Sequence, residues 1–198
     1  MTKGDETRRT ILDHALAQAS RIGLEGITIG QLAEELDLSK SGLFAHFRSK
    51  EALSLAILEH ASERFADKVI RPALKAPRGE PRLRALFDRW CRWPEESGLP
   101  GGCFFVPAMS ELDDRPGPAR DRLVAMQRDL VETLATVVRG AITEKHFRTD
   151  VDPEQMAQEL YGLVLALHLY TRLLEDPKAR RRTKAAFEDL VTAAQRAA

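Results

Sequence analysis

The chain lacks several features that would point to other classes of protein. Its 198 residues include only 2 cysteines, which are too few for a disulfide scaffold and do not have the spacing of a zinc site. Neither charge is in excess, because 30 Lys and Arg residues balance 30 Asp and Glu residues. A formal net charge of +0 excludes recognition of nucleic acid by a bulk basic field, so such a contact must come from a local patch. The simplest expectation is a reduced, cytoplasmic protein.

Long hydrophobic runs are also missing. Residues 1–9 are polar and lack the apolar core of a signal peptide. The most apolar stretch, residues 161–170, contains His168 and is too short to span a bilayer. The 5 histidines are scattered without metal-binding spacing, and no phosphate-binding glycine loop or nucleophile motif is present. We therefore expect no membrane partner, no metal, no cofactor and no catalytic residues.

Apolar residues at helical spacing, three or four apart, run along most of the chain. This spacing predicts an all-α fold of about nine helices without strands. Short, closely punctuated helices fill residues 1–50, and longer helices follow from about residue 80. We therefore predict a head of residues 1–50 and a body of residues 51–198, linked by a helix over about residues 50–70. Several helices are expected to begin at cap residues: Thr28 with Gln31, Ser39, Asp152 with Pro153 and Gln155, and Asp176 with Pro177.

Residues 28–50 form the most informative segment. Two short helices are separated only by Asp37 and Leu38, so they must cross sharply and closely. Ala33 supplies a small side chain at the crossing, and aspartate tolerates a left-handed backbone. The second helix exposes small side chains with one cation and one imidazole: Lys40, Ser41, Gly42, Ala45 and His46. Such a surface suits the major groove of DNA, and the segment is read as a helix-turn-helix.

This segment resembles the DNA-binding domain of the TetR/AcrR family of transcriptional repressors. The residues that carry the resemblance are Thr28, Gln31, Leu32, Ala33, Leu38, Ser39, Leu43, His46, Phe47, Lys50, Glu51 and Leu53. The resemblance covers roughly residues 7–58, and the helical body agrees with it. It implies a homodimer that binds a palindromic double-stranded DNA operator and is released when a small apolar inducer binds in the body.

The resemblance also implies which residues contact DNA. They lie before, along and just after the second short helix: Thr28, Ser39, Lys40, Ser41, Gly42, Phe44, His46 and Lys50. Lys40, Ser41 and Gly42 would lie at the base edges or the backbone beside them, whereas Thr28, His46 and Lys50 would hold phosphates. Phe44 stands where the family usually has a tyrosine. It cannot donate a hydrogen bond, so it would pack against a sugar or a thymine methyl group.

Aromatic and polar-tipped side chains are concentrated in the body. These residues have two possible interpretations, an apolar pocket for a small ligand or ordinary core packing. They are Trp90, Trp93, Phe104, Phe105, Met109, Met126, Tyr161 and His168. The helix over about residues 152–175 is apolar on more than one side. We expect it to pair with its copy, together with the helix after it, through side chains such as Leu167 or Leu174.

Other interpretations remain open at this point. An all-α enzyme could use the aromatic pocket, and a constitutive architectural protein could use the head alone. The basic run over residues 178–184 is interpreted as a solvated face. The sequence leaves open the operator, the target genes, the ligand, whether the protein represses or activates, and whether Cys103 has a sensing role.

Overall fold

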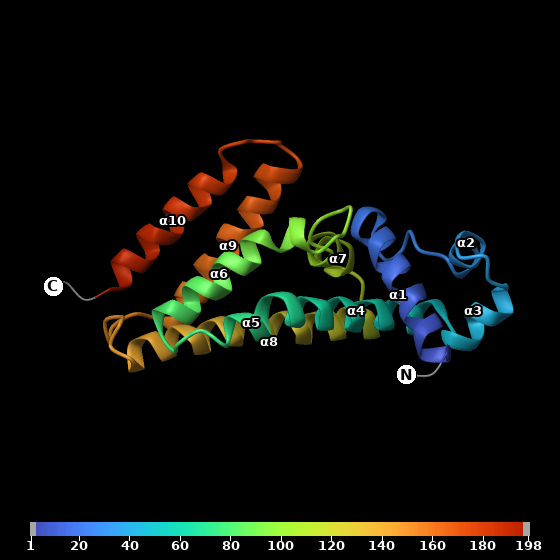
Figure 1. The fold of residues 1–198 in the computed structure, drawn as a ribbon, viewed down its shortest axis with the longest axis horizontal. Helices are drawn as coiled ribbons and strands as arrows, with labels where there is room; N and C mark the ends of the chain where they lie inside the picture. Colours follow the sequence, from blue (N-terminus) through green and yellow to red (C-terminus); the bar gives the residue numbers. More distant parts are fainter. Residues whose placement is uncertain (1–2, 196–198) are drawn as a thin grey trace. The chain divides into compact units, whose positions relative to one another are not determined.

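The structure, a computed structural model, describes residues 3–195 and is all-α (Figure 1). Its elements are α1 (Lys3–Ile22), α2 (Ile29–Glu35), α3 (Lys40–His46), α4 (Lys50–Phe65), the π-helix η1 (Ala66–Ile70), α5 (Arg71–Ala73), α6 (Glu80–Glu96), α7 (Phe105–Leu112), α8 (Pro118–Thr143), α9 (Pro153–Arg172) and α10 (Ala179–Ala194). Because α4, η1 and α5 follow one another without a break, the described chain has nine helical segments, as predicted.

The beginning of the last helix differs from the prediction. Asp176 and Pro177 were expected to start it, but α10 begins at Ala179. The Asp176 carboxylate accepts a hydrogen bond from the Lys178 backbone N–H at 2.8 Å, and Glu175 before it has a positive φ of 49°. These residues therefore form a turn of their own, and the helix starts two residues later. The predicted cap at Asp152 is confirmed, because its side chain accepts from the N–H groups of Glu154 and Gln155.

The chain forms two compact units. The first unit comprises residues 1–65 and 97–125, and the second comprises residues 66–96 and 126–198. The boundary at residue 65 falls where the α-helical turns of α4 give way to the π-helix η1. The predicted division between head and body at residue 50 lies inside the first unit, and it stays a prediction about function.

The core of the first unit is built around α1, which packs against α2, α4 and α7. Buried aliphatic residues recur along α1 at helical spacing: Ile11, Leu12, Ala15, Leu16 and Ala19. Leu32 of α2, Leu43 of α3 and Ile57 of α4 are buried as well. On the outside, His14 of α1 and Glu35 of α2 are joined at 2.6 Å. These buried side chains form the core of the first unit.

In the second unit, α9 packs against both α6 and α10. The rings of Phe87 in α6 and Phe187 in α10 stack with centroids 4.1 Å apart and planes 7° from parallel. In residues 3–195 no helix is long and apolar enough to cross a membrane. The same residues contain no cluster of three or more His, Cys, Asp or Glu side chains that could hold a metal ion.

Candidate nucleic-acid interface and ligand-binding residues

Two hydroxyl groups fix where the short helices begin. The Thr28 hydroxyl accepts a hydrogen bond from the Gln31 backbone N–H at 3.2 Å, and Ser39 accepts one from the Gly42 N–H at 3.0 Å. Both predicted caps are therefore confirmed. The Thr28 hydroxyl also donates to the Gln31 side-chain oxygen at 2.9 Å. It must exchange that bond before it can donate to a DNA phosphate.

The turn between α2 and α3 has the predicted left-handed residue. Asp37 has a φ of 52°, and the next N–H, that of Leu38, donates to the Ala33 carbonyl at 2.8 Å. This bond closes α2 at its C-terminal end and turns the chain sharply into α3. Ala33 is buried at this crossing, as expected, whereas Leu38 is only half-buried.

Helix α3 has one buried face and one exposed face. Leu43 and Phe47, just after the helix, are buried in the first unit. The exposed face carries the small and cationic residues that the sequence predicted: Lys40, Ser41, Gly42 and Ala45. Because few side-chain atoms stand above the backbone there, this face can approach the edges of base pairs closely. The individual DNA contacts remain predictions.

Phe44 adds an apolar group to that face. Its side chain is 51% exposed, which is unusual because phenylalanine is most often buried in a core. Phe47, in contrast, is covered, and the Arg8 guanidinium lies 4.9 Å from the centre of its ring. The His46 ring is half-buried, with its centroid 6.2 Å from that of Phe47. Phe44 is therefore free to contact a sugar or a thymine methyl group.

Lys50 has an acidic partner that the sequence did not indicate. Its ammonium group donates to the Glu25 carboxylate at 2.8 Å and to the Glu25 backbone carbonyl at 2.9 Å. The hydrogen bond from Lys50 lowers the pKa of Glu25, while partial burial opposes this shift and Arg115 assists it. A DNA phosphate that binds Lys50 must therefore share its ammonium group with Glu25 or displace Glu25 from it.

The segment that carries Glu25 is held from α7. The Glu111 carboxylate accepts hydrogen bonds from the backbone N–H groups of Leu24 at 2.7 Å and Glu25 at 2.6 Å. Gly23 ends α1 with a φ of 75°, and a Cβ atom there would overlap the Glu111 carboxylate. Glu111 is far away in the sequence, so no local pattern near Gly23 predicted this contact.

The glycine turn before α7 packs against α1. The Gly101 N–H donates to the Ser20 hydroxyl at 3.0 Å, and a Cβ atom on Gly101 would overlap the Ser20 backbone. This turn therefore anchors the end of α1 through a close backbone approach.

Five of the predicted ligand-binding residues belong to the second unit. Trp90 and Tyr161 meet edge to face with ring centroids 5.2 Å apart, and the Tyr161 hydroxyl donates to Gln127 at 2.6 Å. Trp93 and Met126 are buried. The Nδ1 atom of His168 is buried and has no hydrogen-bond partner among the described residues. Burial, followed by the charge of Arg172, lowers the pKa of His168, which keeps the ring neutral at pH 7.

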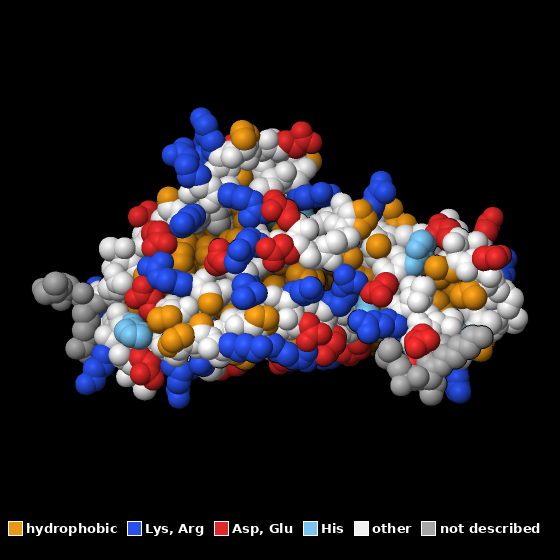
Figure 2. Space-filling view, viewed as in Figure 1, with side chains coloured by type: hydrophobic (Ala, Val, Ile, Leu, Met, Phe, Trp, Pro, Cys, Tyr) orange, Lys and Arg blue, Asp and Glu red, His pale blue; other side chains and the backbone are white. Residues whose placement is uncertain are grey.

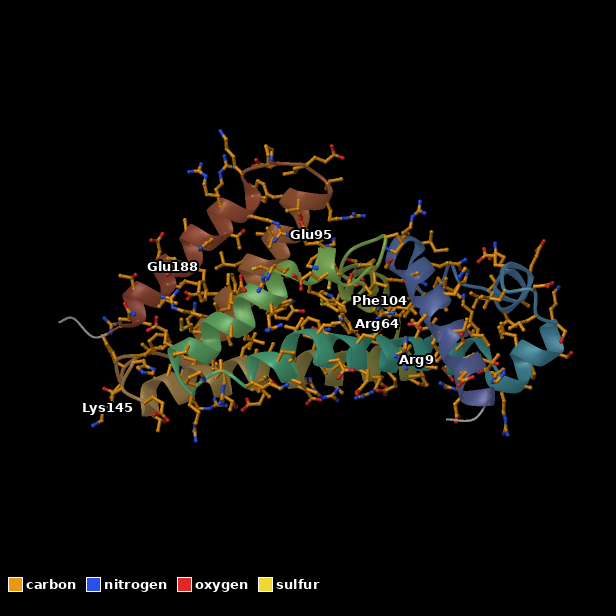
Figure 3. All side chains as sticks on the ribbon, viewed as in Figure 1. Arg9, Arg64, Glu95, Phe104, Lys145 and Glu188 are labelled. Carbon is orange, nitrogen blue, oxygen red and sulfur yellow. The ribbon has the colours of Figure 1, made fainter. Side chains whose placement is uncertain are left out.

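The other three predicted ligand-binding residues belong to the first unit. The rings of Phe104 and Phe105 contact each other with centroids 5.4 Å apart, and Phe65 meets Phe105 at 6.1 Å. Phe104, labelled in Figure 3, is almost fully buried. Met109 is partly exposed on α7. Their use by a ligand remains a prediction.

The fold and the exposed face of α3 define a helix-turn-helix DNA-binding regulator. Comparison with protein families identifies the family of regulators to which the chain belongs. Residues 79–187 match the family described as "Tetracyclin repressor-like, C-terminal domain", and residues 11–57 match "Bacterial regulatory proteins, tetR family". The chain belongs to the TetR family, a family of transcriptional regulators rather than enzymes.

Individual proteins similar to this chain are also named as transcriptional regulators. The transcriptional repressor NemR of Escherichia coli K12 is 25% identical over 178 residues, which cover 84% of this chain and 86% of NemR. A TetR regulator from Chloroflexus aurantiacus superimposes with a TM-score of 0.81 at 28% identity, covering 97% of this chain and 96% of that one. AibR, solved with isovaleryl coenzyme A and operator DNA, shares the fold with a TM-score of 0.72 at 21% identity, covering 95% of this chain and 97% of AibR.

Proposed function

We propose that this protein is a ligand-responsive transcriptional repressor. It binds a palindromic operator as a homodimer, with α3 of each copy in the major groove, and a small apolar ligand in the body releases it. The observation that carries the proposal is the exposed face of α3, which combines small residues with Lys40 and Phe44 on a capped helix. Relatives named as repressors, NemR among them, favour repression over activation.

The homodimer is supported by an exposed apolar face on and just after α9. It consists of residues at helical spacing that are at least 40% exposed: Leu165, Leu169, Tyr170, Leu173 and Leu174. A contiguous apolar surface of this kind is expected to be covered by a partner, and two-fold dimers are the commonest arrangement. Leu167, however, is only 3% exposed, so it belongs to the core of the chain and not to this face. The expectation that it lies at the interface is wrong.

Ligand binding is supported by His168. A buried ring nitrogen without a partner costs free energy, and a polar group on a ligand could form the missing hydrogen bond. The Trp90–Tyr161 pair lies in the same unit and offers apolar surface. Related folds bind organic ligands: one neighbour was solved with choline and AibR with isovaleryl coenzyme A. The inducer proposed for this chain is a small, largely apolar molecule.

Footprinting on the DNA that flanks the gene of this protein tests the proposal. We expect two protected half-sites whose centres lie roughly 34–36 Å apart or a multiple of that. The Lys40→Ala variant should lose part of its preference for this site over a scrambled duplex. Equal affinity of the wild type for both duplexes would contradict sequence-specific operator binding there. A panel of apolar metabolites that quench tryptophan fluorescence should then include a compound that releases the operator.

A further inference from the structure

A groove in the second unit lies between α6 and α10. Its volume is about 460 Å³, which is within the range of small-molecule sites. Its walls come from two helices, with one residue from α9: Arg84, Ala85, Phe87, Asp88, Cys91 and Arg92; Arg180, Thr183, Lys184, Phe187 and Glu188; and Leu167. None of the residues predicted from the sequence to bind the inducer is among them. The groove is therefore separate from the proposed inducer site.

An ion pair lies at one end of the groove. Arg84 of α6 donates to both carboxylate oxygens of Glu188 in α10 at 2.8 Å. Next to this ion pair, the stacked rings of Phe87 and Phe187 join the same two helices. Glu188 and Glu95, labelled in Figure 3, mark opposite ends of the contact between α6 and α10, because Glu95 pairs with Arg180.

The other end of the groove is rich in cations. Arg180 donates to a backbone carbonyl of α6 at 3.0 Å in addition to its pairing with Glu95. Arg92 of α6 is paired with Asp88, which is the one acidic residue lining this end. The side chain of Lys184, one turn after Arg180, is exposed, and its ammonium group makes no hydrogen bond or ion pair with any residue of 3–195. Its charge is available to an anion.

The floor between the two ends is apolar. Phe87, Phe187 and Leu167 are each at most 5% exposed. Burial raises the pKa of the Cys91 thiol to about 12, with Asp88 adding to the shift and Arg180 opposing it. The thiol is therefore neutral at pH 7 and acts as an apolar wall. Figure 2 shows hydrophobic side chains between charged ones over the strip where α6 and α10 face each other.

We propose that this groove binds amphipathic monoanions, molecules with an acyl or aryl body and one carboxylate. The apolar body lies on Phe87, Phe187 and Leu167, and the carboxylate accepts hydrogen bonds from Lys184 and Arg180. Charge-assisted hydrogen bonds of this kind are stronger than neutral ones, so the anionic group sets the specificity. The basic run at 178–184 is thus only partly a solvated face, because two of its members line a binding groove.

Calorimetric titration of the full chain tests the preference for an anion. Decanoate, decanol and decyltrimethylammonium have the same apolar chain and differ in their polar ends. We expect one decanoate to bind per chain, about tenfold or more tighter than decanol, because decanol lacks the charge-assisted hydrogen bonds. The cationic analogue should bind no better than decanol. Failure of decanoate to bind, or equal affinity for decanoate and decanol, would overturn the proposal.

Three variants place the decanoate in the groove. Lys184→Glu reverses the charge at the cationic end and should weaken decanoate binding about tenfold or more. Arg181→Glu is the matched control, because Arg181 is exposed on the same helix turn and does not line the groove. Its decanoate affinity should stay close to that of the wild type. Ala85→Phe fills the groove from the α6 side and should abolish binding.

Circular dichroism should show that the three variants keep the helical content of the wild type. If decanoate binds unchanged to both Lys184→Glu and Ala85→Phe, it occupies another site and the proposal is wrong. These titrations contain no DNA. Their outcome is therefore independent of whether the protein is a repressor, and a failed operator assay would not affect the assignment of the groove.

Discussion

The Lys50 ammonium group lies between two oxygens of Glu25, at 2.8 Å from the carboxylate and 2.9 Å from the backbone carbonyl. Lys50 is predicted to hold a DNA phosphate, so Glu25 and a phosphate compete for the same cation. Both side chains are substantially exposed, and exposed ion pairs are weak. The pair can therefore adjust DNA affinity without preventing binding.

Removing the negative charge of Glu25 should strengthen operator binding. For Glu25→Gln we expect a roughly two- to fivefold gain in affinity, which is the range of an exposed ion pair. Fluorescence anisotropy with a labelled operator measures it. The same substitution in a Lys50→Ala background is the control, because the gain should disappear if it acts through Lys50. An equal gain in both backgrounds would show that Glu25 acts on DNA only by general repulsion.

Lys50 and Lys40 should differ in what they contribute to binding. Lys50→Ala removes a phosphate-binding cation, so it should weaken binding to operator and scrambled duplex about equally and reduce the salt slope by about 1. Lys40→Ala should weaken operator binding more than binding to the scrambled duplex. Titrations at several salt concentrations with both duplexes separate these effects. An unchanged affinity in both variants would mean that another face binds DNA.

The contact between Glu111 and the end of α1 should stabilise the first unit. Gly23→Ala strains a left-handed backbone and pushes the Glu111 carboxylate away from its two N–H donors. Gly98→Ala is a matched control, because Gly98 has a similar φ of 71° but no atom within 4 Å of the added methyl group. In urea unfolding, Gly23→Ala should cost about 1–3 kcal/mol more than Gly98→Ala. Equal costs would show that the Glu111 contact adds nothing.

Local signals predicted much of this fold. Helix caps and tight turns depend on side chains and dihedral angles within a few residues, so they can be predicted from the local sequence. Examples are the caps at Thr28, Ser39 and Asp152 and the left-handed turn at Asp37. The predicted start of α10 is two residues too early, because the Asp-Pro pair that often caps a helix here makes a separate turn before Lys178.

The contacts that surround the predicted site are harder to predict from the sequence. The exposed face of α3 follows from helical periodicity, so its residues are visible in the sequence alone. The partners of that face depend on contacts between distant segments. Glu111 binds backbone groups beside Glu25, and nothing in either local sequence marks that pairing. The groove between α6 and α10 could not be predicted from the sequence for the same reason, since the stacked residues Phe87 and Phe187 are far apart in the chain.

Acid should weaken the first unit through Asp13. Its carboxylate accepts hydrogen bonds from His60 at 2.8 Å and from Arg64 at 2.6 Å. Burial alone would raise the pKa of Asp13, but these two partners together lower it. A lowered folded-state pKa stabilises the fold above the unfolded-state pKa, and this contribution is lost as the pH falls through the folded-state value.

The free energy of unfolding of the wild type should therefore fall more steeply below about pH 5 than that of Asp13→Asn. Urea unfolding at a series of pH values measures both. Asp189→Asn, which removes an exposed carboxylate on α10, controls for the general effect of losing one negative charge. The role of Asp13 would be refuted by parallel pH profiles for the wild type and Asp13→Asn.

The apolar face at the end of α9 should hold two copies together. Leu173 is 74% exposed and Leu174 is 54% exposed, so a glutamate at either position leaves the core of the single chain undisturbed. In a homodimer the same substitution buries a carboxylate against apolar side chains, which is costly. We expect Leu173→Glu to give monomers in light scattering at micromolar concentration and to lose operator binding, because two half-sites need two linked heads. Leu74→Glu places the same charge on an exposed leucine away from α9, and it should remain dimeric. A wild-type protein that is monomeric under these conditions would remove the homodimer from the proposal.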